Sequence, residues 1–132
     1  MRLFIDASAL IAIVAREPER EFFLRRVAEA RDVLWSAISC WETVSGLRSS
    51  HKVPIDIAEQ ETARAATLLS LELVPIAAVE LSEALRAYRE LGRSSGHPAK
   101  LNMGDCFAYA CAKANGARLL YKGDDFVHTD LG

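Results

Sequence analysis

A short apolar run near the N-terminus, Leu3-Phe4-Ile5, ends on the carboxylate of Asp6 and constrains the fold more than any other stretch. Consecutive apolar residues before a polar break predict a strand that is buried on both faces, as in the interior of a parallel sheet. Asp6 would then lie at the carboxyl end of this strand. Ligands of open α/β sheets bind at that edge, because the connecting loops form a crevice there. We therefore expect Asp6 to belong to a functional site.

Strand-like and helix-like segments alternate along the whole chain. The apolar patterns predict strands at 3–5, 33–35, 73–76 and 119–121, and helices at 8–16, 19–31, 39–49, 54–71, 81–91 and 103–115. A length of 132 residues suits one domain with its own core. The sequence therefore predicts a single α/β domain over 1–132, a sandwich of helices around a mostly parallel central sheet.

Composition excludes several classes of protein. The net charge of −2 is not that of a general nucleic-acid coat protein, so any nucleic acid must meet a local basic patch. No apolar run approaches the roughly 18 residues of a membrane span, and Asp6 interrupts the one run that resembles a signal peptide. The chain has an odd number of cysteines and no C-x-x-C pair, which indicates reduced thiols in a cytoplasmic protein: Cys40, Cys106 and Cys111.

Four carboxylates lie at predicted element boundaries within apolar sequence: Asp6, Glu42, Asp105 and Asp124. Strand ends and helix starts share one edge of a parallel sheet, so these four side chains could converge there. Converging carboxylates repel one another unless a cation lies between them. Hard oxygen ligands without His or Cys partners suit Mg²⁺ or Mn²⁺.

Two of these carboxylates have a structural alternative at the start of a helix. Glu42 follows Ser39 by three residues, which is the spacing of a capping box. Asp105 follows the expected cap residue Asn102 by three, so it could close a second box or interact favourably with the helix dipole. On spacing alone, capping and metal binding are equally good explanations of Glu42.

The remaining candidates have alternatives as well. Asp124 and Asp125 follow Gly123 and could simply form a turn. Ser8 could cap the first helix or orient a metal-bound water. Asp6 is the hardest to explain structurally, because a carboxylate at a buried strand end needs a partner.

Candidate substrate-contacting residues are spread along the chain. The loop at 93–98 has the composition of a flexible binding segment. The three histidines are isolated, which favours surface or substrate-facing positions over metal binding. Basic residues of the early helices could contact phosphate, although a solvated helix face explains most of them: Arg16, Arg20, Arg25, Arg26, Arg48 and Lys52.

Three motifs and one isolated acid occur in a familiar order: I-D-A-S-A-L at 5–10, Glu42, H-P-A-K-L-N-M-G-D-C-F-A-Y-A at 97–110, and L-Y-K-G-D-D-F-x-x-T-D-L at 120–131. Together they resemble the PIN-domain ribonucleases, and specifically the VapC-type toxins of bacterial toxin–antitoxin pairs. The resemblance covers essentially the whole chain and implies a PIN-domain-like α/β/α sandwich. One departure is Ala7, where family members often have Thr or Ser, and it removes a hydroxyl but none of the acids.

The resemblance also implies a function: a Mg²⁺- or Mn²⁺-dependent endoribonuclease that cuts a tRNA or rRNA. Asp6 and Asp105 would hold the metal or its waters, and Glu42 and Asp124 would position a second metal or the attacking water. Supporting roles fall to Ser8, Asn102 and Asp125, of which Asp125 could share the role of the fourth acid. The family further implies a homodimer and a cognate antitoxin that inserts a basic side chain into the acidic pocket.

Two other functions fit parts of the sequence. A haloacid-dehalogenase-like phosphatase also ends a strand on Asp, but it needs a second acid two residues later, where this chain has Ser8. A non-catalytic RNA- or protein-binding module would use the same carboxylates only as caps and turn residues.

Overall fold

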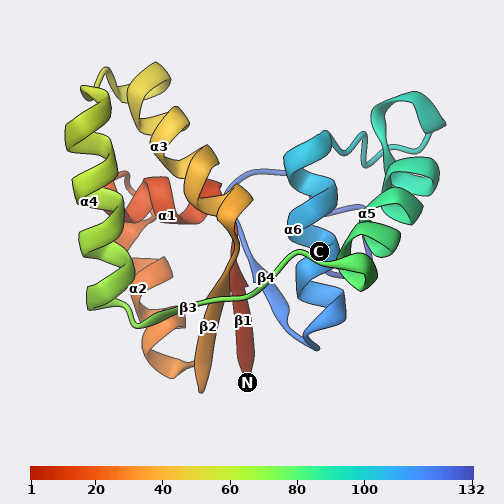
Figure 1. Cartoon of the computed structure of the whole chain (residues 1–132), viewed down its shortest axis with the longest axis horizontal. Coiled ribbons are helices and arrows are strands. Elements are labelled where there is room, and N and C mark those ends of the chain that lie inside the picture. The colour runs from red at the N-terminus through yellow and green to blue at the C-terminus, as the bar shows by residue number, and fades with distance from the viewer.

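The computed structural model describes residues 1–132 as four strands, six α-helices and one 3-10 helix (Figure 1). In chain order these are β1 (Arg2–Ile5), α1 (Ala7–Val14), α2 (Arg20–Glu29), β2 (Asp32–Trp35), α3 (Ala37–His51), α4 (Ile55–Leu68), β3 (Leu71–Leu73), α5 (Ala78–Leu91), η1 (Arg93–Ser95), α6 (Met103–Ala114) and β4 (Arg118–Leu120). None of the helices is long and apolar enough to cross a membrane.

The four strands form one parallel sheet in the order β3-β2-β1-β4. β1 lies in the interior, where Phe4 is paired with Leu34 of β2 on one side and with Leu119 of β4 on the other. Leu3, Phe4 and Ile5 are all fully buried. The expected two-sided burial of the first strand and the parallel α/β architecture are thus confirmed.

Alternate residues of β1 face two different cores, which gives the molecule three layers. Leu3 and Ile5 pack in a core with α1 and α2, whereas Phe4 packs on the opposite face with α5 and α6. Helix α3 packs against α1 and α4, and it also contacts α6. Figure 1 shows α3 sloping across the top of the sheet, with its first turn toward α6. The carboxyl ends of the strands therefore lie below the start of α3.

Two expected helix caps are wrong, and both errors have the same cause. Helix α3 begins at Ala37, and its capping box joins Ser36 to Ser39, so the predicted box between Ser39 and Glu42 does not form. Helix α1 is capped by Asp6, which accepts the backbone N–H of Ser8, and not by Ser8 itself. A cap is the residue that still has extended backbone where the strand ends. Strand pairing, and not the serine spacing, sets that residue.

Two further boundaries on the β3 side differ from the expected ones. Helix α5 begins at Ala78, three residues earlier than expected, because the Glu80 carboxylate accepts the N–H of Ala77 at 2.8 Å. Strand β3 covers Leu71–Leu73 instead of 73–76, although Val74 still donates its N–H to Trp35 O at 2.9 Å. Strand β3 forms one edge of the sheet.

Candidate active site

Asp6 lies at the carboxyl end of β1 and is only 7% exposed. Its Oδ2 accepts two hydrogen bonds from Ser8, one from the backbone N–H at 3.1 Å and one from Oγ at 2.6 Å. Burial raises the pKa of Asp6, and the two bonds from Ser8 oppose this shift. The carboxylate is thus held in one orientation at the edge of the sheet where ligands bind in such folds.

Ser8 connects the first turn of α1 to the segment that follows β4. Its Oγ donates to Asp6 and accepts the backbone N–H of Lys122 at 2.9 Å. Lys122 lies just after β4, so this contact joins the end of the last strand to the start of α1. Ser8 therefore orients Asp6 and does not cap the helix.

Glu42 lies in the second turn of α3, is half-buried, and makes no hydrogen bond or ion pair within the chain. Its carboxylate packs directly on the Cα of Gly104 at the start of α6, where any side chain would collide with it. Burial, followed by the charges of Asp6 and Asp105, raises the pKa of Glu42 to about 7. Without a capping role, Glu42 is an unpartnered acid that faces two others.

Asp105 lies in the first turn of α6 and is 8% exposed. It forms the expected capping box with Asn102: the Asp105 N–H donates to Asn102 Oδ1 at 2.8 Å, and Asp105 Oδ2 accepts the Asn102 N–H at 3.1 Å. Burial is nevertheless the main factor that raises the pKa of Asp105 to about 7, and the charges of Asp125 and Asp6 add to it. Capping therefore fixes this carboxylate without removing it from the acidic cluster.

Asp124 and Asp125 occupy an exposed turn after β4, where Gly123 has a φ of +90° that suits glycine. The charge of Asp125 contributes to the raised pKa values of both Asp6 and Asp105, whereas Asp124 is not among the charges that raise them. The structure thus gathers Asp6, Glu42, Asp105 and Asp125, and it places Asp124 beside them on the same turn.

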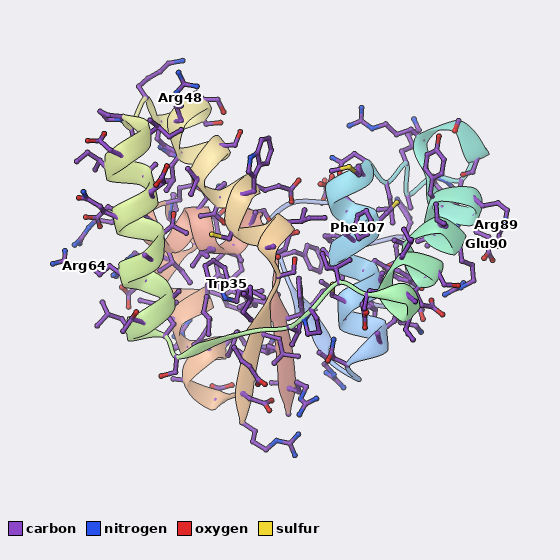
Figure 2. The ribbon with its side chains drawn as sticks, in the orientation of Figure 1. Trp35, Arg48, Arg64, Arg89, Glu90 and Phe107 are labelled. Carbon is purple, nitrogen blue, oxygen red and sulfur yellow. The ribbon has the colours of Figure 1, made fainter.

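A shallow groove of about 610 Å³ continues from this turn. Its lining is mostly polar or charged and comes from two segments: Arg93, Pro98, Ala99, Lys100, Asp124, Asp125 and His128. None of the basic residues expected from the early helices lines it. One of them, Arg48, projects from the end of α3 that is remote from α6 (Figure 2).

Sequence reasoning missed two residues that hold the site together. Gly104 permits the close approach of Glu42, and a glycine in the first turn of a helix, where it costs about 1 kcal/mol relative to Ala, was the available signal. Lys122 places its Nζ 2.6 Å from Glu17 and 3.4 Å from Glu19, and Glu17 also lies 2.8 Å from His51 Nε2. No local pattern reveals the Lys122 contacts, because the partners are about 100 residues away.

The oxygen donors of the acidic cluster are of the kind that hard divalent cations prefer. No three His, Cys, Asp or Glu side chains form an arrangement that would hold an ion by themselves. Mg²⁺ typically keeps several waters and uses only one or two protein carboxylates together with substrate phosphate, so a loose cluster suits it. The unpartnered carboxylate of Glu42, beside two acids that raise its pKa, is the group that a cation would stabilise.

Comparison with known proteins places the sequence in a family. The model of the PIN domain matches residues 3–131. A VapC ribonuclease of Rhizobium meliloti (strain 1021) is 36% identical, and the alignment covers 98% of this chain and 99% of that protein. Ribonuclease VapC42 of Mycobacterium tuberculosis (strain ATCC 25618 / H37Rv) is 32% identical over 98% of this chain and 96% of that one.

Solved structures of low sequence identity share the fold. A chain of a toxin–antitoxin complex from Klebsiella pneumoniae superposes with a TM-score of 0.72 at 19% identity and covers 98% of this chain and 93% of that one. Mycobacterium tuberculosis VapC20, described as a sarcin-ricin loop cleaving toxin, gives a TM-score of 0.67 at 18% identity, covering 95% and 92%. With a family model that matches nearly every residue and relatives above 30% identity over almost their full length, this chain belongs to the PIN-domain family and is a member of its VapC type.

Proposed function

We propose that this protein is a divalent-metal-dependent endoribonuclease, the toxin of a toxin–antitoxin pair, which hydrolyses phosphodiester bonds of structured RNA such as tRNA or rRNA. The observation that carries the proposal is the meeting of Asp6, Glu42 and Asp105 at the carboxyl edge of the sheet, with raised pKa values. The ribonuclease activity is inferred from the 36% identity to a VapC ribonuclease over 98% of this chain.

The acids divide into those that hold the ion and one that handles the water. Asp6 and Asp105 are each fixed by hydrogen bonds, to Ser8 and Asn102, so they are suited to hold Mg²⁺ or Mn²⁺ directly or through its waters. When bound, the ion polarises the phosphate and lowers the pKa of a bound water. Glu42 has no other partner in the chain and faces the two fixed acids, so it positions the attacking water and accepts its proton.

The fourth acid comes from the exposed turn. The family motif at 120–131 favours Asp124 as the fourth acid. The charges favour Asp125, because its charge raises the pKa of both Asp6 and Asp105. We assign the main role to Asp125 and a lesser electrostatic role to Asp124. Both lie at the groove through which a single strand would reach the cluster.

The test is cleavage of a labelled structured RNA during a Mn²⁺ titration. Asp6→Asn should lower kcat by about 10³-fold, because it removes a negative ligand while Asn still accepts the bonds from Ser8. Asp56→Asn, an exposed acid in the first turn of α4, serves as the control. Full activity of Asp6→Asn would refute the assignment.

The same protein preparation separates the alternative functions. A haloacid-dehalogenase-like phosphatase would hydrolyse p-nitrophenyl phosphate, which we do not expect because Ser8 occupies the place of its second acid. A non-catalytic binding module would show no Mn²⁺-dependent rise in Tm, whereas a specific ion site stabilises the fold by mass action.

A cognate antitoxin and self-association belong to this proposal. Support comes from large apolar side chains left exposed on α3 and α4, above all Trp41, which is 70% exposed and borders a groove with Val44 and Ile55. Contiguous apolar patches of this kind mark protein interfaces. Light scattering should show a dimer at micromolar concentration, and the product of a neighbouring reading frame should form a stable complex and inhibit cleavage.

A further inference from the structure

The groove beside the acids contains two cations that pair with no carboxylate. Neither Arg93 nor Lys100 has a nitrogen within 4.0 Å of a carboxylate oxygen, although Asp124 and Asp125 line the same groove. Both side chains belong to exposed residues. They are therefore free to bind an anion that enters from solvent.

Two lysines that contact other parts of the chain are already neutralised. Lys122 lies 2.6 Å from Glu17, and Lys113 lies 2.6 Å from Asp130. Carboxylates of the chain thus pair with Lys122 and Lys113, but none pairs with the two cations of the groove. This difference separates structural ion pairs from charges available to a ligand.

The backbone that carries Arg93 and Lys100 is held in place. The Arg93 N–H donates to Leu101 O at 3.2 Å, and the Leu101 N–H donates to Leu91 O at 2.9 Å, so the two cations lie on paired segments. Lys100 stands between the buried residues Ala99 and Leu101. It adopts a φ of +50°, which a residue with a Cβ atom disfavours.

The loop between these residues is fixed by its own hydrogen bonds. Ser95 Oγ donates to Gly92 O at 2.7 Å and accepts the His97 N–H at 3.1 Å, and His97 Nδ1 accepts the Ala99 N–H at 3.0 Å. The segment expected from sequence to be flexible is thus a bonded turn. Its two exposed cations are presented from an ordered backbone, which lowers the entropy lost when they bind a ligand.

We propose that Arg93 and Lys100 form a phosphate-binding subsite that holds the RNA backbone next to the cleaved phosphodiester. This inference rests on the proposed ribonuclease function. Asp125 connects the groove to the acidic cluster, because it lines the groove and its charge also raises the pKa of Asp6 and Asp105. Contacts from these two cations to phosphate position the strand without reading its sequence.

The experiment compares charge-removing variants in binding and in cleavage. Arg93→Gln, Lys100→Gln and the double variant are measured with wild type for KM and kcat, and again in the Asp6→Asn background for binding of a fluorescent single-stranded RNA. Lys52→Gln is the matched control, because Lys52 is also exposed, free of ion pairs and in left-handed backbone at φ +58°. The salt dependence of the dissociation constant is recorded for each protein.

Each single variant should raise KM about two- to fivefold, as expected for one exposed charge contact, and leave kcat within about twofold. The slope of log Kd against log salt should fall by about 0.7 for each cation removed. Lys52→Gln should match wild type. The Mn²⁺-induced rise in Tm should be the same in all of them, because the cations do not touch the ion.

Two further results distinguish the possible failures. Lys100→Gly removes the charge but suits the positive φ, so it should show the same loss of salt slope as Lys100→Gln; a wild-type slope in Lys100→Gly would overturn the subsite. If all groove variants keep the salt slope and the KM of the wild type and the proteins still cleave RNA, the subsite is overturned and the ribonuclease proposal stands. If wild type itself fails to cleave RNA with Mn²⁺, the ribonuclease proposal fails and the subsite with it.

Discussion

The two halves of the acidic cluster are built differently. Asp6, Glu42 and Asp105 come from elements packed into the two cores, and all three have raised pKa values. Asp124 and Asp125 come from an exposed turn. Hydrogen bonds inside the fold hold the side chains of Asp6 and Asp105, whereas the exposed half depends on contacts that hold its turn against the rest of the protein.

Phe126, which is buried in the core directly after Asp125, anchors one side of the exposed half, and Lys122, two residues before Asp124, anchors the other. The backbone N–H of Lys122 is bound by Ser8 Oγ, which also holds Asp6, and its side chain is bound by Glu17. Lys122 therefore links the exposed turn to Ser8, the residue that orients Asp6. Burial positions the first half of the site, whereas the contacts of Lys122 and the burial of Phe126 position the second.

Glu42 tests the buried half without touching the hydrogen bonds that hold Asp6 and Asp105, and of the four tests of this comparison it should give the largest effect. Glu42→Gln keeps the shape but cannot accept a proton, so kcat should fall about 10²- to 10³-fold with little change in KM. Glu59→Gln, on the exposed face of α4, is the control. Steady-state kinetics at saturating Mn²⁺ measures the effect, and a loss of less than threefold would remove Glu42 from the chemistry.

Asp125 and Asp124 test the exposed half against each other. Asp125→Asn should lower kcat/KM about 10- to 100-fold, because its charge acts on both buried aspartates. Asp124→Asn should cost less than about fivefold. Parallel cleavage assays with Mn²⁺ titrations decide the assignment, and the reverse order of effects would transfer the role to Asp124.

Lys122 tests the coupling between the halves. Lys122→Met should weaken Mn²⁺ binding and lower kcat, each by about tenfold, and Lys122→Arg should restore most of both because it can still pair with Glu17. The matched control is Lys113→Met, which breaks an ion pair of the same length with Asp130. Equal losses in the two Met variants would indicate general destabilisation and contradict the coupling.

The pH dependence of stability should give the smallest effect, and it tests the raised pKa values of the buried half. In the folded chain the pKa of Glu42 and of Asp105 is about 7, above their ordinary values of 4.5 and 3.8. These two groups therefore bind more protons in the folded state than in the unfolded state, and the stability that they contribute is fully present below the ordinary values and is lost as pH rises through about 7.

Urea unfolding in EDTA should accordingly show a fall of roughly 1–3 kcal/mol in the free energy of unfolding between pH 5 and pH 8, after allowance for solvent screening. Saturating Mn²⁺ should reduce or reverse the fall, because the ion stabilises the charged carboxylates. Glu42→Gln should remove only its own part of the fall in EDTA, because burial still raises the pKa of Asp105. A profile that rises over this interval in wild type would contradict the raised pKa values.

Local patterns in the sequence determined a large part of this protein. The apolar run at Leu3–Ile5 and the alternation of strands and helices predicted the buried first strand and the parallel sheet. A strand that is buried on both faces needs consecutive apolar residues, and this pattern is visible in the sequence. The box between Asn102 and Asp105 was also predictable, since both partners lie in one helical turn. Long motifs in the right order pointed to the PIN-domain family.

Only the tertiary structure decided which acids have structural roles and which remain free. Whether Ser36 or Ser39 caps α3 depends on where β2 stops pairing, and that choice leaves Glu42 without a partner. The approach of Glu42 to Gly104 and the pairing of Lys122 with Glu17 join segments far apart in the chain. Such contacts depend on how whole layers pack, which neighbouring residues do not encode.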